Sequence, residues 1–148
     1  MKDELVVPPI LENLSIVAEF LQEKIKETHL TSRKAWELLL VTDEICSHII
    51  HFRKYDSTMG KMRILWEGLP DKVVVTIETS GIPFNPLELN SMDNVKEEEE
   101  ESLGGMGIHL VKQMIDEIDY KRTNNSNILK ITKLKRSRRN RINNKNNL

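Results

Sequence analysis

Apolar residues recur at three- and four-residue intervals in three stretches of the chain. The first stretch runs from Ile10 to about Glu27, and the second from a cap at Thr31 or Ser32 to about Tyr55. The third runs from Ile108 to about Glu117. This spacing is typical of amphipathic helices, which bury one face against a core. The pattern therefore predicts three helices, the first of them starting after the helix-breaking pair Pro8-Pro9.

Apolar and polar residues alternate in other segments, which indicates strands with one side against the core. These segments are Lys2–Val7, Lys61–Glu67, Lys72–Glu78, Ile118–Arg122 and Ile128–Leu134. Short polar turns at Leu69-Pro70-Asp71 and Asn124-Asn125-Ser126 predict antiparallel hairpins. Grouped strands with helices between them predict an α+β fold. We expect a two-layer sandwich with helices on one face of a mixed, mostly antiparallel sheet.

Two segments have no periodic apolar pattern. Residues 87–103 contain consecutive acids from Glu97 to Glu101, so we expect a mobile loop or lid there. Residues 136–148 are basic and rich in asparagine, which predicts a disordered tail. The remaining length is enough for one core, so we expect a single domain over residues 1–135.

The composition excludes several classes of protein. Hydrophobic residues make up 39% of the chain and charged residues 30%, as in a soluble globular protein. No apolar run reaches the roughly 18 residues of a membrane span, and the acidic N-terminus is no secretory signal. The lone Cys46 cannot form an internal disulfide, and its apolar neighbours predict an inert core residue. We therefore expect a cytoplasmic protein.

The charge is unevenly distributed along the chain. The net charge is −1, but the segment Lys135–Leu148 alone carries +6, which leaves −7 for the rest. A body of this charge has no broad surface for nucleic acid. Three interpretations of the tail stay open: a solubilising disordered end, a site for nucleic acid or another anionic partner, or a latch onto Glu97–Glu101.

The glycine-rich segment Gly104-Gly105-Met106-Gly107 leads directly into the helix that begins at Ile108. Glycines let backbone N–H groups approach a ligand closely, and a helix N-terminus adds partial positive charge. Together they suit a phosphate group. Taken alone, such a segment is also simply a turn.

The second helix carries the other candidate chemistry. Glu44, His48 and Phe52 follow one another at four-residue intervals, so a carboxylate and an imidazole share one face. The alternative for Glu44 is an acid facing solvent. A transition-metal site formed by His48 with His51 or His109 is a second alternative. We expect the buried face of this helix to carry Trp36, Leu39, Leu40, Asp43, Cys46, Ser47 and Ile50.

Three groups of candidate site residues thus follow in order along the chain: Glu44 with His48, Thr79 with Gly81 at the end of a strand, and Gly104–Gly107. Their order and spacing resemble those of the GHKL (Bergerat-fold) ATPases, and especially the RsbW/SpoIIAB-type anti-sigma factor serine/threonine kinases. The resemblance covers about Leu5 to Lys135. It is most specific over Gly104–Glu117, and Pro83–Leu87 and Asn127–Leu129 also match.

The resemblance implies ATP and Mg²⁺ as cofactors and assigns roles to residues. Glu44 takes the position of the general base. His48 takes the position of an asparagine that holds Mg²⁺, and Thr79 that of an aspartate that binds the adenine amino group, two residues before Gly81. Asn85 stands where the family has a further aspartate. The phosphate-binding segment is intact: Gly104, Gly105, Met106, Gly107 and Ile108.

The changes at His48 and Thr79 affect both ends of the nucleotide. Mg²⁺ prefers oxygen ligands, whereas an imidazole offers nitrogen and repels a cation once protonated. A threonine hydroxyl replaces a charge-assisted acceptor, and such a bond contributes about 1.5–3 kcal/mol against about 1 for a neutral one. Phosphoryl transfer depends on the metal to neutralise developing charge. We therefore expect ATP binding and kinase activity to be weakened.

The resemblance implies a regulatory protein that binds a sigma factor, a STAS-domain antagonist or both, and that forms a homodimer. The alternative is a catalytically inactive protein-binding module that has lost nucleotide binding. His48 and Thr79 are the positions that distinguish these two hypotheses.

Overall fold

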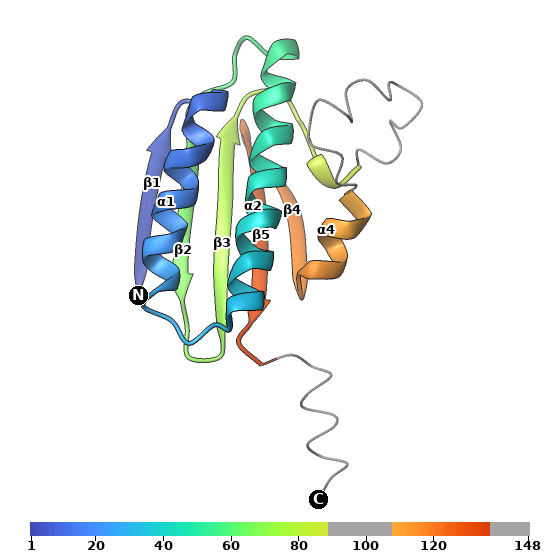
Figure 1. Ribbon diagram of the computed structural model, residues 1–148. Helices are drawn as coiled ribbons and strands as arrows, with labels where there is room; N and C mark the ends of the chain where they lie inside the picture. Colours follow the sequence, from blue (N-terminus) through green and yellow to red (C-terminus); the bar gives the residue numbers. More distant parts are fainter. Residues whose placement is uncertain (89–107, 137–148) are drawn as a thin grey trace, which may run out of the picture.

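The computed structural model describes residues 1–88 and 108–136 of the chain. An antiparallel sheet forms one layer, and helices cover one of its faces (Figure 1). The strands are β1 (Lys2–Val7), β2 (Met62–Gly68), β3 (Lys72–Ser80), β4 (Glu117–Thr123) and β5 (Ser126–Leu134). The helices are α1 (Leu14–Ile25), α2 (Ser32–Phe52) and α4 (Ile108–Met114), with 3₁₀ turns η1 (Leu11–Asn13) and η2 (Arg53–Tyr55).

The strand order in the sheet is β1-β2-β3-β5-β4, and every pair between the described strands is antiparallel. The predicted two-layer α+β sandwich is confirmed. β3 and β5 lie side by side in the middle of the sheet, with Thr79 opposite Asn127. This register brings Thr79, a candidate site residue, next to Asn127 from a segment far along the chain.

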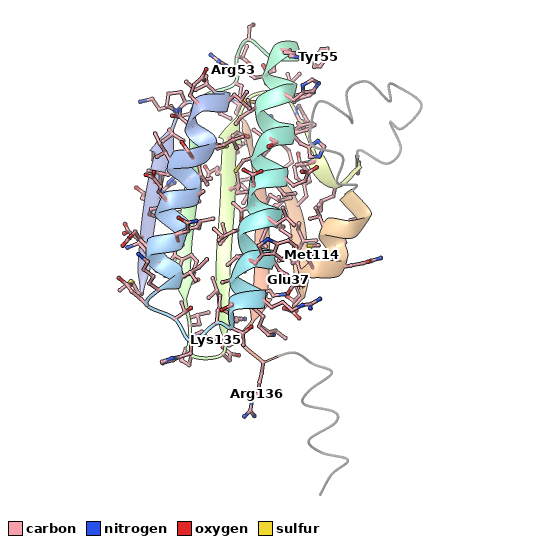
Figure 2. The ribbon with its side chains drawn as sticks, viewed as in Figure 1. Glu37, Arg53, Tyr55, Met114, Lys135 and Arg136 are labelled. Atoms are coloured by element: carbon pink, nitrogen blue, oxygen red, sulfur yellow. The ribbon has the colours of Figure 1, made fainter. Side chains whose placement is uncertain are left out.

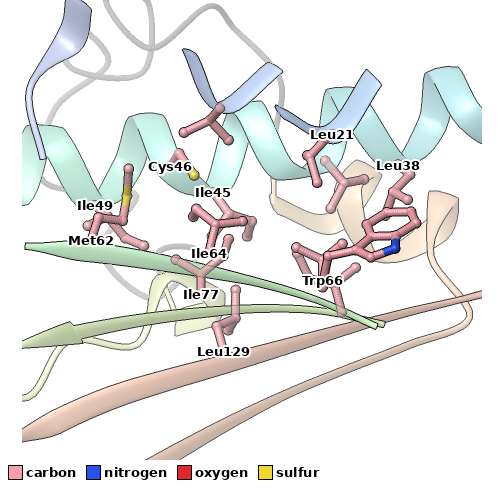
Figure 3. Close-up of a cluster of buried hydrophobic side chains, with 14 of the residues drawn as sticks. Leu21, Leu38, Ile45, Cys46, Ile49, Met62, Ile64, Trp66, Ile77 and Leu129 are labelled. Atoms are coloured by element: carbon pink, nitrogen blue, oxygen red, sulfur yellow. The ribbon is translucent and has the colours of Figure 1, made fainter. Parts of the chain in front are cut away.

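The hydrophobic core lies between the sheet and α1 and α2 (Figure 3). Leu21 of α1, Leu38 of α2 and Trp66 of β2 fill one end of it, and Ile45 packs over Ile64 near its middle. Cys46 is fully buried, as predicted, and burial raises the pKa of its thiol.

The buried face of α2 differs from the one we expected. Trp36 is 55% exposed and Asp43 is also exposed, whereas Cys46 lies inside. The buried apolar residues of α2 are Leu38, Val41, Ile45, Cys46 and Ile49, and Leu39 and Ile50 of the expected face are partly buried against the core. α2 carries two overlapping apolar stripes, and the periodicity alone does not tell which one the sheet covers. The stripe rich in branched residues packs on the sheet, and Trp36 stays outside.

The ends of the helices are set by local hydrogen bonds. Thr31 caps α2, because its hydroxyl accepts from the Lys34 amide at 3.2 Å, as predicted. α1 begins later than expected, since the chain first forms a turn in which the Asn13 side-chain amide donates to the Pro8 carbonyl at 2.8 Å. α4 ends at Met114, three residues earlier than predicted, because β4 already begins at Glu117.

A buried lysine joins three elements at the lower end of the sheet. Nζ of Lys133, on β5, donates to Oε1 of Glu37 on α2 at 3.0 Å and to the Met114 carbonyl at the end of α4. Figure 2 shows Glu37 and Met114 at this place. Lys133 therefore ties the short helix α4 to α2 and to the sheet.

Within the described residues, no helix is long and apolar enough to cross a membrane.

Candidate functional site

Glu44 and His48 form a pair on α2, one helical turn apart. Nε2 of His48 lies 3.1 Å from Oε1 of Glu44, and both side chains are buried. The sequence prediction that one helix face presents a carboxylate and an imidazole to the same place is confirmed. The alternative of a solvent-facing Glu44 is wrong, because only 6% of this residue is exposed.

The contact between the two side chains limits what each can do. An ionised carboxylate only accepts hydrogen bonds, so Nε2 of His48 carries the hydrogen when Glu44 is ionised. A ring nitrogen that carries a hydrogen has no lone pair for a metal, so only Nδ1 of His48 could then act as a ligand. The bond also occupies one carboxylate oxygen of Glu44 and leaves Oε2 as the oxygen that could accept a proton.

Asp43 precedes this pair on the exposed side of α2. Burial of its carboxyl raises its pKa, and the neighbouring charge of Glu44 raises it further. This part of α2 therefore places two neighbouring carboxyl groups, those of Asp43 and Glu44, before His48.

Thr79 is buried at the end of β3 and lines a small internal cavity of about 10 Å³. α2 contributes Ile49, the residue that follows His48. The other lining residues are Ile77, Phe84, Pro86, Tyr120, Asn127 and Leu129. A cavity of this size holds about one water molecule. Among the described residues, the position that the resemblance assigns to adenine therefore has little free space.

Phe84 closes the cavity from the loop that follows β3. Its ring stacks on Phe52 at the end of α2, with centroids 4.0 Å apart and planes 7° from parallel. Its backbone amide donates to Oδ1 of Asn127 at 2.9 Å. The loop is thus held by α2 on one side and by β5 on the other.

Asn127 is the centre of the polar contacts around this loop. Its side-chain amide donates to the Ile82 carbonyl at 2.9 Å, and its Oδ1 also accepts from the Tyr120 hydroxyl and from Arg122. The side chain is buried, so these bonds replace the water that it would otherwise bind. The sequence pointed to Asn127 only as part of a matching strand and gave no sign of this role.

Asp56 holds Gly81 and its neighbour in place. Its carboxylate accepts from the Thr58 hydroxyl and amide and from the Ile82 amide at 2.8 Å. These hydrogen bonds hold the pKa of Asp56 below its usual range, and the bond from the Thr58 hydroxyl has the largest effect. Gly81 has φ +132°, and a Cβ there would lie 2.2 Å from Oδ2 of Asp56. Glycine adopts this positive φ without strain, and it has no Cβ to collide with the carboxylate.

The sequence analysis missed Asp56, although a signal was present. An aspartate two residues before a threonine, directly after a helix, is typical of a local Asx turn. The hydrogen bond from the distant Ile82 amide could not be predicted from the local sequence.

The glycines Gly104, Gly105 and Gly107, with Met106, lie outside the described residues, as does most of the predicted lid and residues 137–148 of the tail. Ile108 begins α4, as predicted. The described residues contain no group of three histidine, cysteine, aspartate or glutamate side chains placed to hold a metal ion.

Residues 7–133 match the family described as the histidine kinase-like ATPase domain. The match covers most of the chain, so this protein belongs to that family. No curated protein matches the chain. Among solved structures, one chain of the SiaB–SiaC complex from Pseudomonas aeruginosa has a TM-score of 0.56 and 12% sequence identity, over 89% of this chain and 88% of that one. At this identity the likeness shows a shared fold.

A family of ATPase domains implies an ATP site, so we asked whether the described residues fit Mg-ATP. Pockets for small molecules usually measure about 300–1,000 Å³. The cavity beside Thr79 measures about 10 Å³ and is closed by Phe84. At the metal position, His48 offers a nitrogen where Mg²⁺ prefers oxygen, and its Nε2 is bonded to Glu44. Among residues 1–88 and 108–136, the space beside Thr79 is too small for an adenine base, and His48 is a poor ligand for magnesium.

Proposed function

We propose that this protein is a regulatory domain of the anti-sigma factor kinase type that acts by binding other proteins, and whose nucleotide chemistry is weak. The observation that carries the proposal is the small cavity at Thr79, together with the mutual bond of Glu44 and His48. The family supports an ancestry in ATP-dependent chemistry. Of the two positions on which that chemistry depends, His48 is bonded to Glu44 and Thr79 is buried.

The proposed partners are a sigma factor, a STAS-domain antagonist or both, in the cytoplasm. The structural neighbour was solved as a complex of two proteins, SiaB and SiaC, which supports the use of this fold for binding a protein. A homodimer is part of the same proposal. Residual nucleotide binding would use Gly104–Ile108 for the phosphates and leave Glu44 in the position of the base.

Isothermal titration with Mg-ATP tests the nucleotide part of the proposal. We expect little or no heat from the natural chain at micromolar concentrations. The double variant His48→Asn with Thr79→Asp returns an oxygen ligand and a charged acceptor, so we expect measurable binding. Low-micromolar affinity of the natural chain, together with phosphate transfer to a partner, would contradict the proposal.

A second candidate is a protein-binding module that has lost nucleotide binding altogether. The stacking of Phe84 on Phe52 favours it, because the loop blocks the cavity whatever residue stands at position 79. Adding Phe84→Ala to the double variant separates the two candidates. Binding by the double variant supports the first, whereas no binding even by the triple variant supports the second.

The proposed binding of a partner protein is tested in the absence of nucleotide. The full chain is mixed with candidate STAS-domain proteins and sigma factors of the same genome, and complexes are followed by size-exclusion chromatography with light scattering. We expect a stable complex in the absence of ATP. A complex that forms only with Mg-ATP would contradict the proposal.

A further inference from the structure

A surface groove of about 480 Å³ lies between the turn that precedes α1 and the end of α2. Its lining residues are Pro9, Ile10, Leu11, Ile50, Arg53, Lys54 and Ser57. Arg53 and Tyr55 mark this end of α2 in Figure 2. The groove shares no lining residue with the cavity beside Thr79, so it is a separate site. Its volume falls within the range of about 300–1,000 Å³ that is usual for binding pockets.

One wall of the groove is apolar and fixed in shape. Leu11 is 65% exposed, which is high for a leucine. It projects from a turn that is held by hydrogen bonds from the Ile10 amide and from the Asn13 side chain, both to the Pro8 carbonyl, at 2.9 and 2.8 Å. The backbone that presents Leu11 is therefore ordered before a partner covers it, so only the side chain loses conformational freedom on binding.

The other wall is cationic. Arg53 and Lys54 are exposed, and the lining contains these two cations and no acid. Among the described residues, none of the ion pairs involves Arg53 or Lys54. An anionic group can therefore approach them without displacing a carboxylate of the described chain. Ile50 also lines the groove and is partly buried.

We propose that this groove binds an acidic, amphipathic segment of a partner protein. Apolar side chains of the segment would cover Leu11 and Ile50, and its carboxylates would pair with Arg53 and Lys54. The apolar wall and the small number of cations favour a peptide over a nucleic acid, which requires a longer basic stripe. This inference rests on the proposed protein-binding function and assigns to it a surface and a class of ligand.

The first test uses a fluorescent helical peptide with leucines on one face and glutamates on the other. A matched peptide has lysines in place of the glutamates. We expect fluorescence polarisation to show binding of the acidic peptide by the full chain and a loss of about tenfold or more with Arg53→Glu/Lys54→Glu. We expect Leu11→Ser to weaken binding as well, with a smaller dependence on salt.

The control is Arg33→Glu, which reverses an exposed cation at the other end of α2. It changes the net charge in the same sense and should leave binding unchanged. Equal binding of both peptides, no binding of either, or an equal loss with the control overturns the proposal. Dimerisation of the natural chain that is abolished by Leu11→Ser also overturns it, because a second copy would then occupy the groove.

The partner experiment distinguishes this inference from the proposed function. If a STAS-domain protein or a sigma factor binds the natural chain and the Arg53→Glu/Lys54→Glu variant equally, the groove is not the binding surface while the proposed function stands. If no such partner binds the natural chain although the acidic peptide does, the groove stands and the proposed function fails.

Discussion

α2 carries two acid–base pairs that are largely shielded from solvent, and they differ in what they connect. Glu37 pairs with Lys133, which lies 96 positions away on β5 and also binds the end of α4. Glu44 pairs with His48, four positions away on the same helix. The first pair joins three elements of the fold. The hydrogen bond of the second pair lies within a single helix.

The difference distinguishes residues that hold the fold together from residues of the candidate site. Removing one member of a buried pair leaves the other without compensation, but the total cost also depends on how many elements the pair holds together. Lys133 is part of the architecture, because α4 is positioned through it. The Glu44–His48 pair can change its chemistry while the sheet and the helices remain as they are.

The largest effect is expected from Lys133→Ala. This change leaves Glu37 and the Met114 carbonyl without their donor and should lower the free energy of unfolding by about 3–5 kcal/mol. Urea unfolding followed by circular dichroism measures it. Lys130→Ala, an exposed lysine on the same strand, is the control and should change stability by less than about 0.5 kcal/mol. Equal effects at the two positions would show that the buried contacts carry no stability.

His48→Ala should cost less, about 1–3 kcal/mol, because it removes a single local hydrogen bond from a buried carboxylate. His48→Asn keeps a side-chain donor and should stay within about 1 kcal/mol of the natural chain. The same urea experiment compares both variants with Lys133→Ala. A loss with His48→Ala as large as that with Lys133→Ala would place the histidine in the scaffold and remove the contrast between the two pairs.

Phe84→Ala should have a smaller effect still. It removes the stacking on Phe52, which for an aromatic pair contributes about 0.5–1.5 kcal/mol beyond burial, and Phe84 is only half-buried. Thermal unfolding measures the loss, with the exposed Ile82→Ala in the same loop as the control. An unfolded Phe84→Ala protein would mean that the loop is part of the core and not a cover over the cavity.

The smallest effect is expected from Asp56→Asn, and it depends on pH. The pKa of Asp56 in the folded protein lies below its value in the unfolded chain, which is about 3.9. Its stabilising contribution is therefore complete above the unfolded pKa and disappears as the pH falls through the folded pKa. Urea unfolding between neutral and acidic pH should show the natural chain more stable than Asp56→Asn at neutral pH, with the difference shrinking on acidification.

Asp119→Asn is the control for that titration. Asp119 is exposed, and its carboxyl accepts none of the hydrogen bonds formed by the described side chains. A constant difference between Asp56→Asn and the natural chain at all pH values would contradict the assignment.

Local pattern predicted most of the fold. β1 and both hairpins follow from alternation and turn residues, and the cap of α2 follows from Thr31. The face of α2 could not be predicted, because Trp36 and Leu38 belong to stripes of similar hydrophobicity and the sheet alone decides between them. Burial of a lysine at position 133 also depends on partners that only the folded chain brings near.

The candidate site was predictable where its contacts are local. The Glu44–His48 contact follows from four-residue spacing on a helix. The closure of the cavity was not predictable, because Phe84 meets Phe52 and Asn127 only after the sheet has formed. The resemblance singled out Thr79, but only the structure shows that the space beside it, among the described residues, measures about 10 Å³.

The short spacing of Glu44 and His48 has a consequence for the history of the chain. The hydrogen bond between them lies within α2, so a substitution at position 48 removes none of the described hydrogen bonds between elements. A substitution at position 133 removes the bonds that Lys133 forms to α2 and to α4. Descendants of such a gene can therefore exchange one chemistry for another at position 48 while inheriting the same scaffold.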